Sequence, residues 1–63
     1  MTPERDLIDA AYQDAVKKVF ASFFDQYVQA GGSAEEQQAA EQHFTNGMAT
    51  AKKVYALAVG LLS

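Results

Sequence analysis

Apolar residues recur in adjacent pairs every four positions through the first half of the chain. The pairs are Leu7-Ile8, Ala11-Tyr12, Ala15-Val16, Val19-Phe20, Phe23-Phe24 and Tyr27-Val28. Most residues between them are polar, so this period predicts one amphipathic helix. Thr2, Pro3 and Glu4 match the N-cap and first turn of a helix, which we expect from about residue 3 to residue 30. Four residues overshoot one helical turn by about 40°, so the apolar stripe migrates and one straight neighbour cannot cover it all.

The second half of the chain carries two apolar rows at heptad-like spacing. The first row is Phe44, Met48, Ala51, Tyr55, Ala58 and Leu62, and the second is Gly47, Thr50, Val54, Leu57 and Leu61. Intervals of four and three residues are typical of a helix that packs along another helix. The rows lie about 60° apart on a helix from about residue 34 to residue 62. Two adjacent seams predict two neighbouring helices, as in a four-helix bundle.

Between the two halves, the stretch QAGGSAEE at residues 29–36 combines a helix stop with a helix start. Gly31 and Gly32 suit the left-handed conformation that ends a helix, and Ser33 with Glu36 forms a capping-box pattern. Two helices of nearly equal length joined by so short a connection fold back on each other. The sequence therefore predicts an all-α antiparallel hairpin that forms a single domain over residues 1–63.

Asn46 and Gly47 offer a competing interpretation, because Asn-Gly is a common turn dipeptide and glycine inside a helix costs about 1 kcal/mol relative to alanine. A break at this point gives three helices and a compact monomer. Both apolar rows keep their phase across Gly47, whereas a turn disturbs such a phase. A continuous second helix is therefore the preferred prediction.

The two ends of the predicted hairpin lack apolar partners within one chain. With the turn centred near residue 32, Phe20 faces Phe44 and large residues face small ones over much of the length. Tyr27, however, opposes the polar segment 35–38, and the leucines at the C-terminus oppose only the polar N-terminus. Both ends therefore need a cover from outside the chain.

A second copy, rotated by a two-fold axis, covers both ends together. The aromatic end of one hairpin lies against the leucine-rich end of the other, so we expect a homodimer that forms a four-helix bundle, with a dimer of dimers as a further step. The expected dimer interface consists of Phe23, Phe24, Tyr27, Val28, Val54, Leu57, Val59, Leu61 and Leu62. A docking surface for a different protein and a ligand pocket are the alternative uses of the aromatic cluster.

The composition agrees with a small domain that needs a partner. The chain has 63 residues, of which 49% are hydrophobic and 21% charged, and it has no cysteine. A domain of this size buries only about 60% of its unfolded surface, and neither a disulfide nor a thiolate metal site can compensate. The apolar tract at residues 54–62 is shorter than the about 20 residues of a membrane span, and the N-terminus lacks a signal-peptide pattern. We expect a cytoplasmic protein with no membrane span.

Residues suited to catalysis or cofactor binding are scarce. The single histidine, His43, has Ala40 three positions before it, so the Glu-x-x-His pattern of a bundle metal site fails. The predicted pairing places no serine near this histidine, and no glycine-rich phosphate loop with a lysine is present. We therefore expect no enzymatic activity, no metal and no cofactor.

The charge pattern disfavours nucleic acid as a partner. The net charge is −3, with five basic and eight acidic residues, and the lysine pairs 17–18 and 52–53 fit solvated helix faces. We expect a small non-enzymatic interaction or structural protein, a homodimeric adaptor, regulator or assembly piece whose further partner is another protein. The alternative is an RNA- or DNA-binding regulator that uses one helical face of a hairpin dimer.

Overall fold

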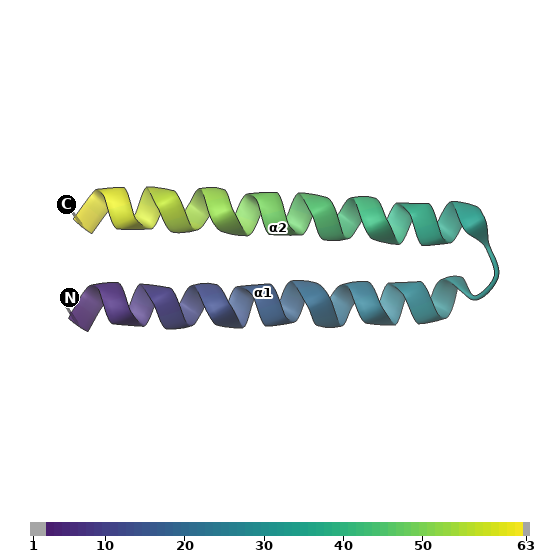
Figure 1. The fold of residues 1–63 in the computed structure, drawn as a ribbon, viewed down its shortest axis with the longest axis horizontal. Helices are drawn as coiled ribbons and strands as arrows, with labels where there is room; N and C mark the ends of the chain where they lie inside the picture. The colour runs from purple at the N-terminus through teal and green to yellow at the C-terminus, as the bar shows by residue number, and fades with distance from the viewer. Residues whose placement is uncertain (1–2, 63) are drawn as a thin grey trace.

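The computed structural model describes residues 3–62, and both of its elements are α-helices. Helix α1 spans Pro3–Ala30 and helix α2 spans Ala34–Leu62, with 28 and 29 residues respectively. The helices lie side by side and antiparallel, so the chain ends meet at one end of the molecule and the loop lies at the other (Figure 1). The predicted helical hairpin is confirmed for these residues, and the predicted N-cap, Thr2, lies outside them.

The loop contains the predicted left-handed glycine in full, but only one of the two hydrogen bonds of the predicted capping box. Gly31 has a φ of 56°, which is left-handed, and its N–H donates to the Val28 carbonyl at 3.2 Å. Ser33 Oγ accepts a hydrogen bond from the Glu36 N–H at 3.3 Å, as in a capping box. The reciprocal bond is replaced, because the Ser33 N–H donates to the Ala30 carbonyl at 3.0 Å. The next turn is held by Gln37, whose Nε2 donates to the Gly31 carbonyl at 2.7 Å.

Helix α2 runs without a break through Asn46 and Gly47, so the three-helix alternative is wrong. Gly47 lies where the two helices approach each other closely. A Cβ atom at this position would lie 3.0 Å from Val19 Cγ1 and 3.3 Å from Val19 Cγ2. The absence of a side chain at Gly47 thus lets Val19 pack against the backbone of α2.

The contact between the helices is a narrow seam. Its residues follow each other at intervals of three or four: Ile8, Tyr12, Ala15, Val19, Phe23, Gln26 and Ala30 on α1, and Gln37, Ala40, Phe44, Gly47, Ala51, Tyr55 and Ala58 on α2. Within residues 3–62 only Ala30 and Ala40 are buried, with 6% and 2% of their surface exposed. Every large side chain of the seam is therefore only half-buried.

The register of the seam differs from the predicted one by about one turn. The rings of Phe23 and Phe44 lie 4.8 Å apart, as do those of Tyr12 and Tyr55, whereas we expected Phe20 to face Phe44. Side chains on a helix lean toward its N-terminus. In an antiparallel pair the two leanings are opposite, so contacting residues have Cα atoms at different heights. A pairing drawn from Cα positions alone therefore falls short by three to four residues.

Candidate interaction surfaces

The seam divides the hairpin into two faces. Each residue turns by about 100° around its helix, so residues immediately before and after a seam position point to opposite faces. Because the helices are antiparallel, the residues after seam positions share one face on both helices. We call this the front face, since it is turned to the reader in Figure 1. The opposite, back face carries the residues that precede seam positions.

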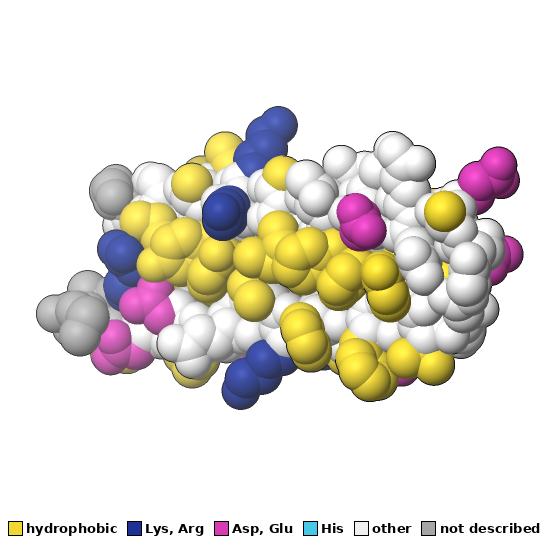
Figure 2. All heavy atoms as spheres, turned by 45° about the vertical axis from the view of Figure 1, so that its right-hand side comes forward, with side chains coloured by type: hydrophobic (Ala, Val, Ile, Leu, Met, Phe, Trp, Pro, Cys, Tyr) yellow, Lys and Arg dark blue, Asp and Glu magenta, His cyan; other side chains and the backbone are white. Residues whose placement is uncertain are grey.

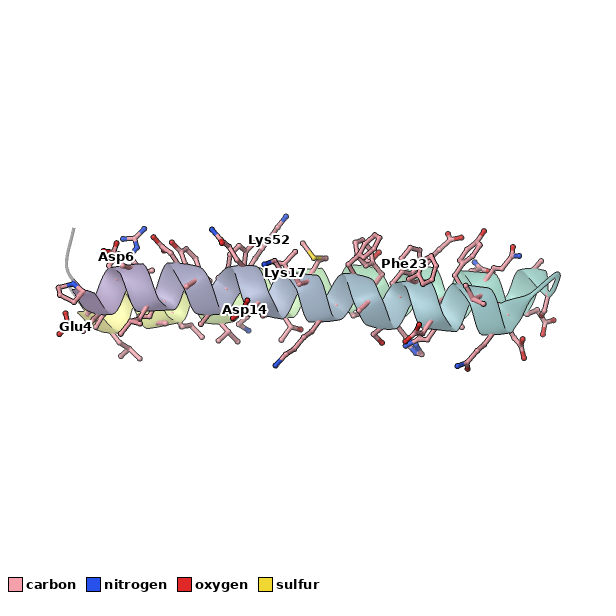
Figure 3. The ribbon with its side chains drawn as sticks, turned by 90° about the horizontal axis from the view of Figure 1, so that it is seen from below. Glu4, Asp6, Asp14, Lys17, Phe23 and Lys52 are labelled. Carbon is pink, nitrogen blue, oxygen red and sulfur yellow. The ribbon has the colours of Figure 1, made fainter. Side chains whose placement is uncertain are left out.

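An edge-on view makes the two faces visible. Figure 3 shows the hairpin from below, with the front face uppermost. The labelled side chains of Phe23, Lys52 and Asp6 rise on the front side, while Glu4 points to the back. Lys52 directly follows the seam residue Ala51, as this definition of the front face requires.

Large apolar side chains are exposed on both faces. Within residues 3–62 they are Leu7, Phe20, Phe24, Tyr27, Val28, Val54, Leu57, Leu61 and Leu62, with exposed fractions from 40% to 87%. Monomeric soluble proteins rarely leave contiguous apolar patches of this kind in water, and such patches mark interaction sites. Their positions therefore define the candidate surfaces of the molecule.

The front face carries the aromatic cluster near the loop. Phe23 is held by the hairpin itself, because its ring packs on Phe44 at 4.8 Å and on Tyr27 at 5.7 Å. Phe20 and Phe24 extend beyond this contact, and each has 58% of its surface exposed. A shallow hollow of about 360 Å³ is lined by Phe20, Phe23, Phe24, Tyr27 and Glu41.

The aromatic cluster continues into a longer band. Figure 2 shows hydrophobic side chains gathered along the groove between the helices, from the loop end to the end where the chain termini meet. Met48 and Val59 belong to this face by their helical positions, and both are half-buried. We call this surface the front band: Val16, Phe20, Phe23, Phe24, Tyr27, Met48, Tyr55 and Val59.

The back face carries an aliphatic groove at the opposite end of the molecule. The groove has a volume of about 220 Å³ and is lined by Ile8, Ala11, Tyr12, Ala15, Ala51, Val54, Tyr55 and Ala58. Leu7 and Leu57, with 71% and 58% of their surface exposed, lie beside it by helical rotation. Small residues thus form the floor of this groove, and larger aliphatic residues form its rim.

A polar cluster closes the seam near the chain termini. The hydroxyl of Tyr55 donates a hydrogen bond to Asp9 Oδ1 and accepts one from Arg5 Nη2 at 3.1 Å. Arg5 Nε also donates to Asp9 Oδ1 at 3.2 Å. The hydrogen bond from Tyr55 holds the pKa of the Asp9 carboxyl below its ordinary value; partial desolvation opposes this effect and Arg5 adds to it. The pKa of Arg5 is raised, first of all by its bond to Tyr55.

A second polar chain fixes the histidine on the back face near the loop. His43 Nδ1 lies 2.9 Å from Gln26 Oε1, and Gln26 Nε2 donates to Ser22 Oγ at 2.9 Å. Since the amide nitrogen of Gln26 is used on the serine, its oxygen accepts from the imidazole N–H. His43 therefore acts as a bridge across the seam.

Chemical sites are not apparent in the part of the chain that the structure describes. No three histidine, cysteine, aspartate or glutamate side chains gather there in a way that could hold a metal ion. Over the same residues, no helix combines the length and the apolar character needed to cross a bilayer. The expected absence of catalysis and of cofactors stays a prediction.

The structure separates the predicted dimer interface into several groups. Phe23, Phe24, Tyr27 and Val59 lie on the front face, Val54, Leu57 and Leu61 lie on the back face, Leu62 ends the seam, and Val28 points outward from α1. One flat contact cannot bury both the front and the back residues. The sequence prediction grouped residues by their height along the hairpin, and it did not include Phe20 and Leu7, which are also exposed.

The Arg5, Asp9 and Tyr55 cluster was also missed. Its sequence signal is the spacing of four between Arg5 and Asp9, which places opposite charges on one side of a helix. The third member, Tyr55, belonged to the predicted seam, but the predicted register did not point to its hydroxyl. A contact between polar atoms of two helices needs the correct register before it can be seen.

Comparisons of the chain with known protein families, with curated proteins and with solved structures gave no match. The function must therefore be argued from the two apolar faces and the polar clusters themselves.

Proposed function

We propose that the chain is a homodimeric, non-enzymatic interaction protein whose two hairpins stack front face on front face in a four-helix bundle. The observation that carries this proposal is the front band, which runs along the whole groove between the helices (Figure 2). A four-helix bundle has such a band at its centre, because each hairpin contributes its seam and one adjacent face to the core. We propose an antiparallel arrangement, in which the aromatic end of each hairpin lies at the height of Val59 and Leu62 of the other.

The energy of burial favours this assembly over a free hairpin. Full burial of one large apolar side chain contributes about 1.5 to 3 kcal/mol. Phe20, Phe24 and Tyr27 are between 40% and 58% exposed in the single hairpin. Two copies of each, together with the aliphatic residues of the band, offset an association cost on the order of 10 kcal/mol. The assembled bundle then serves as an adaptor, regulator or assembly piece, with a protein as its further partner.

The alternative function is the binding of RNA or DNA, but no observation favours it. On the face shown in Figure 2 the basic side chains are scattered over both helices without forming a continuous patch, and the acidic side chains lie toward both ends of the hairpin. Phosphate binding draws on clustered positive charge, and the chain as a whole has a net charge of −3.

A matched pair of variants tests the front contact. Phe24 and Val28 lie one turn apart on α1 and have 58% and 63% of their surface exposed, but only Phe24 belongs to the front band. Phe24→Glu places a charge in the proposed core, so light scattering at micromolar concentration should report loss of the dimer. Val28→Glu should leave the dimer intact. An unchanged mass for Phe24→Glu would refute the front contact and would favour a docking site for another protein.

A further inference from the structure

Front-to-front stacking leaves the back face on the outside of the bundle. This face carries an aliphatic surface near the chain termini, which we call the back patch: Leu7, Ile8, Ala11, Val54, Leu57 and Leu61. Leu7 and Leu61 are 71% and 87% exposed, the highest values among the large apolar residues of the described chain. Contiguous exposure of this kind indicates an interaction site, and the charges around the patch indicate which partner fits.

Three charged residues of α1 lie on the back face around the patch, Glu4, Asp14 and Lys18, and two of them flank it at equal distances. Glu4 lies seven residues before Ala11 and Lys18 lies seven residues after it. Seven residues are close to two helical turns, so all three positions lie on the same side of α1, with each charge about 10 Å from Ala11. Glu4 points to the back of the hairpin in Figure 3, and Glu4 and Lys18 are both exposed.

This arrangement is complementary to a second copy of itself. If a two-fold axis passes beside Ala11 and the two back patches face each other, helix α1 runs antiparallel to α1 of the other copy. Glu4 of each chain then meets Lys18 of the other, which makes two ion pairs at the rims of the apolar contact. About this axis, opposing positions on α1 add up to 22, so Leu7 of one copy lies over Ala15 of the other. The neighbouring Asp14 is exposed on the same face, and its carboxylate has to stay in water at the edge of the contact.

We propose that the back patch is a second self-association surface, centred on Ala11 and framed by reciprocal Glu4–Lys18 pairs. This contact goes beyond the proposed front dimer and does not require it. Each chain then has one two-fold contact on each face, so dimers join into tetramers and the tetramers can extend further or close into a ring. With this second contact the protein acts as an assembly unit, and the size of its assemblies increases with protein concentration.

Charge exchange tests the identity of the partner. Glu4→Lys and Lys18→Glu each replace two attractive pairs by two repulsive ones, and each should weaken association beyond the dimer by about tenfold at low salt. The double variant Glu4→Lys/Lys18→Glu restores the pairs only if both residues meet across a contact between identical chains. Sedimentation should therefore show recovery of the tetramer. A double variant that is as weak as the single ones would overturn the proposal.

Single cysteines test the position of the axis, since the natural chain has none. Ala11→Cys should give a covalent dimer on mild oxidation, because the two copies of residue 11 face each other at the axis. Ala10→Cys is the control, because this exposed alanine lies about 100° further round the same helix. Equal rates of cross-linking at both positions would mean random collision and would refute a contact centred on Ala11.

Separate variants should disrupt the front contact and the back contact. Leu57→Glu should abolish the tetramer and keep the front dimer, whereas Phe24→Glu should keep the Ala11→Cys cross-link. If Leu57→Glu leaves the assembly unchanged, the back patch is not a contact between copies. If the wild-type chain never exceeds a dimer and vesicles or another protein bind the patch instead, the proposal is wrong while the proposed front dimer stands.

Discussion

At the scale of single residues, Gly47 shows how a poor helix former can be the better choice. Alanine is favoured over glycine inside a helix by about 1 kcal/mol. In this hairpin, however, a Cβ atom at residue 47 would lie 3.0 Å from Val19 Cγ1. Valine in a helix has one strongly preferred rotamer and cannot easily turn away. The glycine therefore exchanges local helix stability for a close contact between the helices.

This conflict predicts a dependence on the partner residue. Gly47→Ala alone should be neutral or destabilising, because contact with Val19 cancels the propensity gain. In a Val19→Ala background the same change should stabilise the protein by about 1 kcal/mol. Urea unfolding of the four variants at one protein concentration gives the coupling energy, which we expect to be at least about 1 kcal/mol. The same effect of Gly47→Ala in both backgrounds would mean that the helices can separate without cost.

Asp9 gives the fold a dependence on acid pH. Its pKa is lowered in the folded state, chiefly by the hydrogen bond from Tyr55. A group with a lowered folded pKa adds stability above its unfolded pKa of about 3.9, and this stability is lost as the pH falls through the folded value. Asp9→Asn and Tyr55→Phe should therefore lose less stability than the wild type between pH 5 and acid pH, as measured by urea midpoints. Parallel pH profiles for all three proteins would contradict the role of this cluster.

At the scale of elements, the helix boundaries were predictable because stop and start signals are adjacent in the sequence. Gly31 ends α1 and Ser33 begins α2, as their residue types indicated. The register was not predictable from the same reasoning, because it depends on the direction in which side chains lean. The expected interface was drawn from heights along the hairpin alone, and residues at one height can lie on opposite sides of it.

The loop glycines predict a difference between two neighbouring residues. Of the glycines in residues 3–62, only Gly31 has a positive φ. Gly31→Ala should cost about 1 to 2 kcal/mol, since an L-residue is strained in this conformation even though no atom would touch its Cβ. Gly32→Ala meets no neighbour and no such strain, so thermal melts should show it as neutral or slightly stabilising. Equal losses for both variants would show that the turn does not depend on the left-handed residue.

At the scale of the whole molecule, the hairpin is too thin to hold a core of its own. It measures 47 by 15 by 9 Å between Cα atoms, and its radius of gyration is 14.7 Å. A compact domain of this length has a radius of gyration of about 11 Å. Only two alanines are buried within the described residues. Most of the apolar surface that could stabilise the fold is therefore available only to contacts between molecules.

This shape predicts that folding and association are coupled. If the hairpins are stable only when paired, the melting temperature must rise with protein concentration. A hundredfold increase in concentration adds about 2.7 kcal/mol to the stability of a dimer, which corresponds to roughly 10 °C for a bundle of this size. Circular dichroism melts over this range measure the shift directly.

A variant separates this coupling from the stability of the hairpin itself. Phe24→Ser leaves the ring contact between Phe23 and Phe44 in place, because Phe24 lies beyond it on the front face. It should nevertheless lower the melting temperature at every concentration, since it removes part of the proposed interface. A wild-type melting temperature that does not change with concentration would show that the single hairpin is stable alone. In that case the exposed aromatic residues have no part in folding, and their role is restricted to binding another molecule.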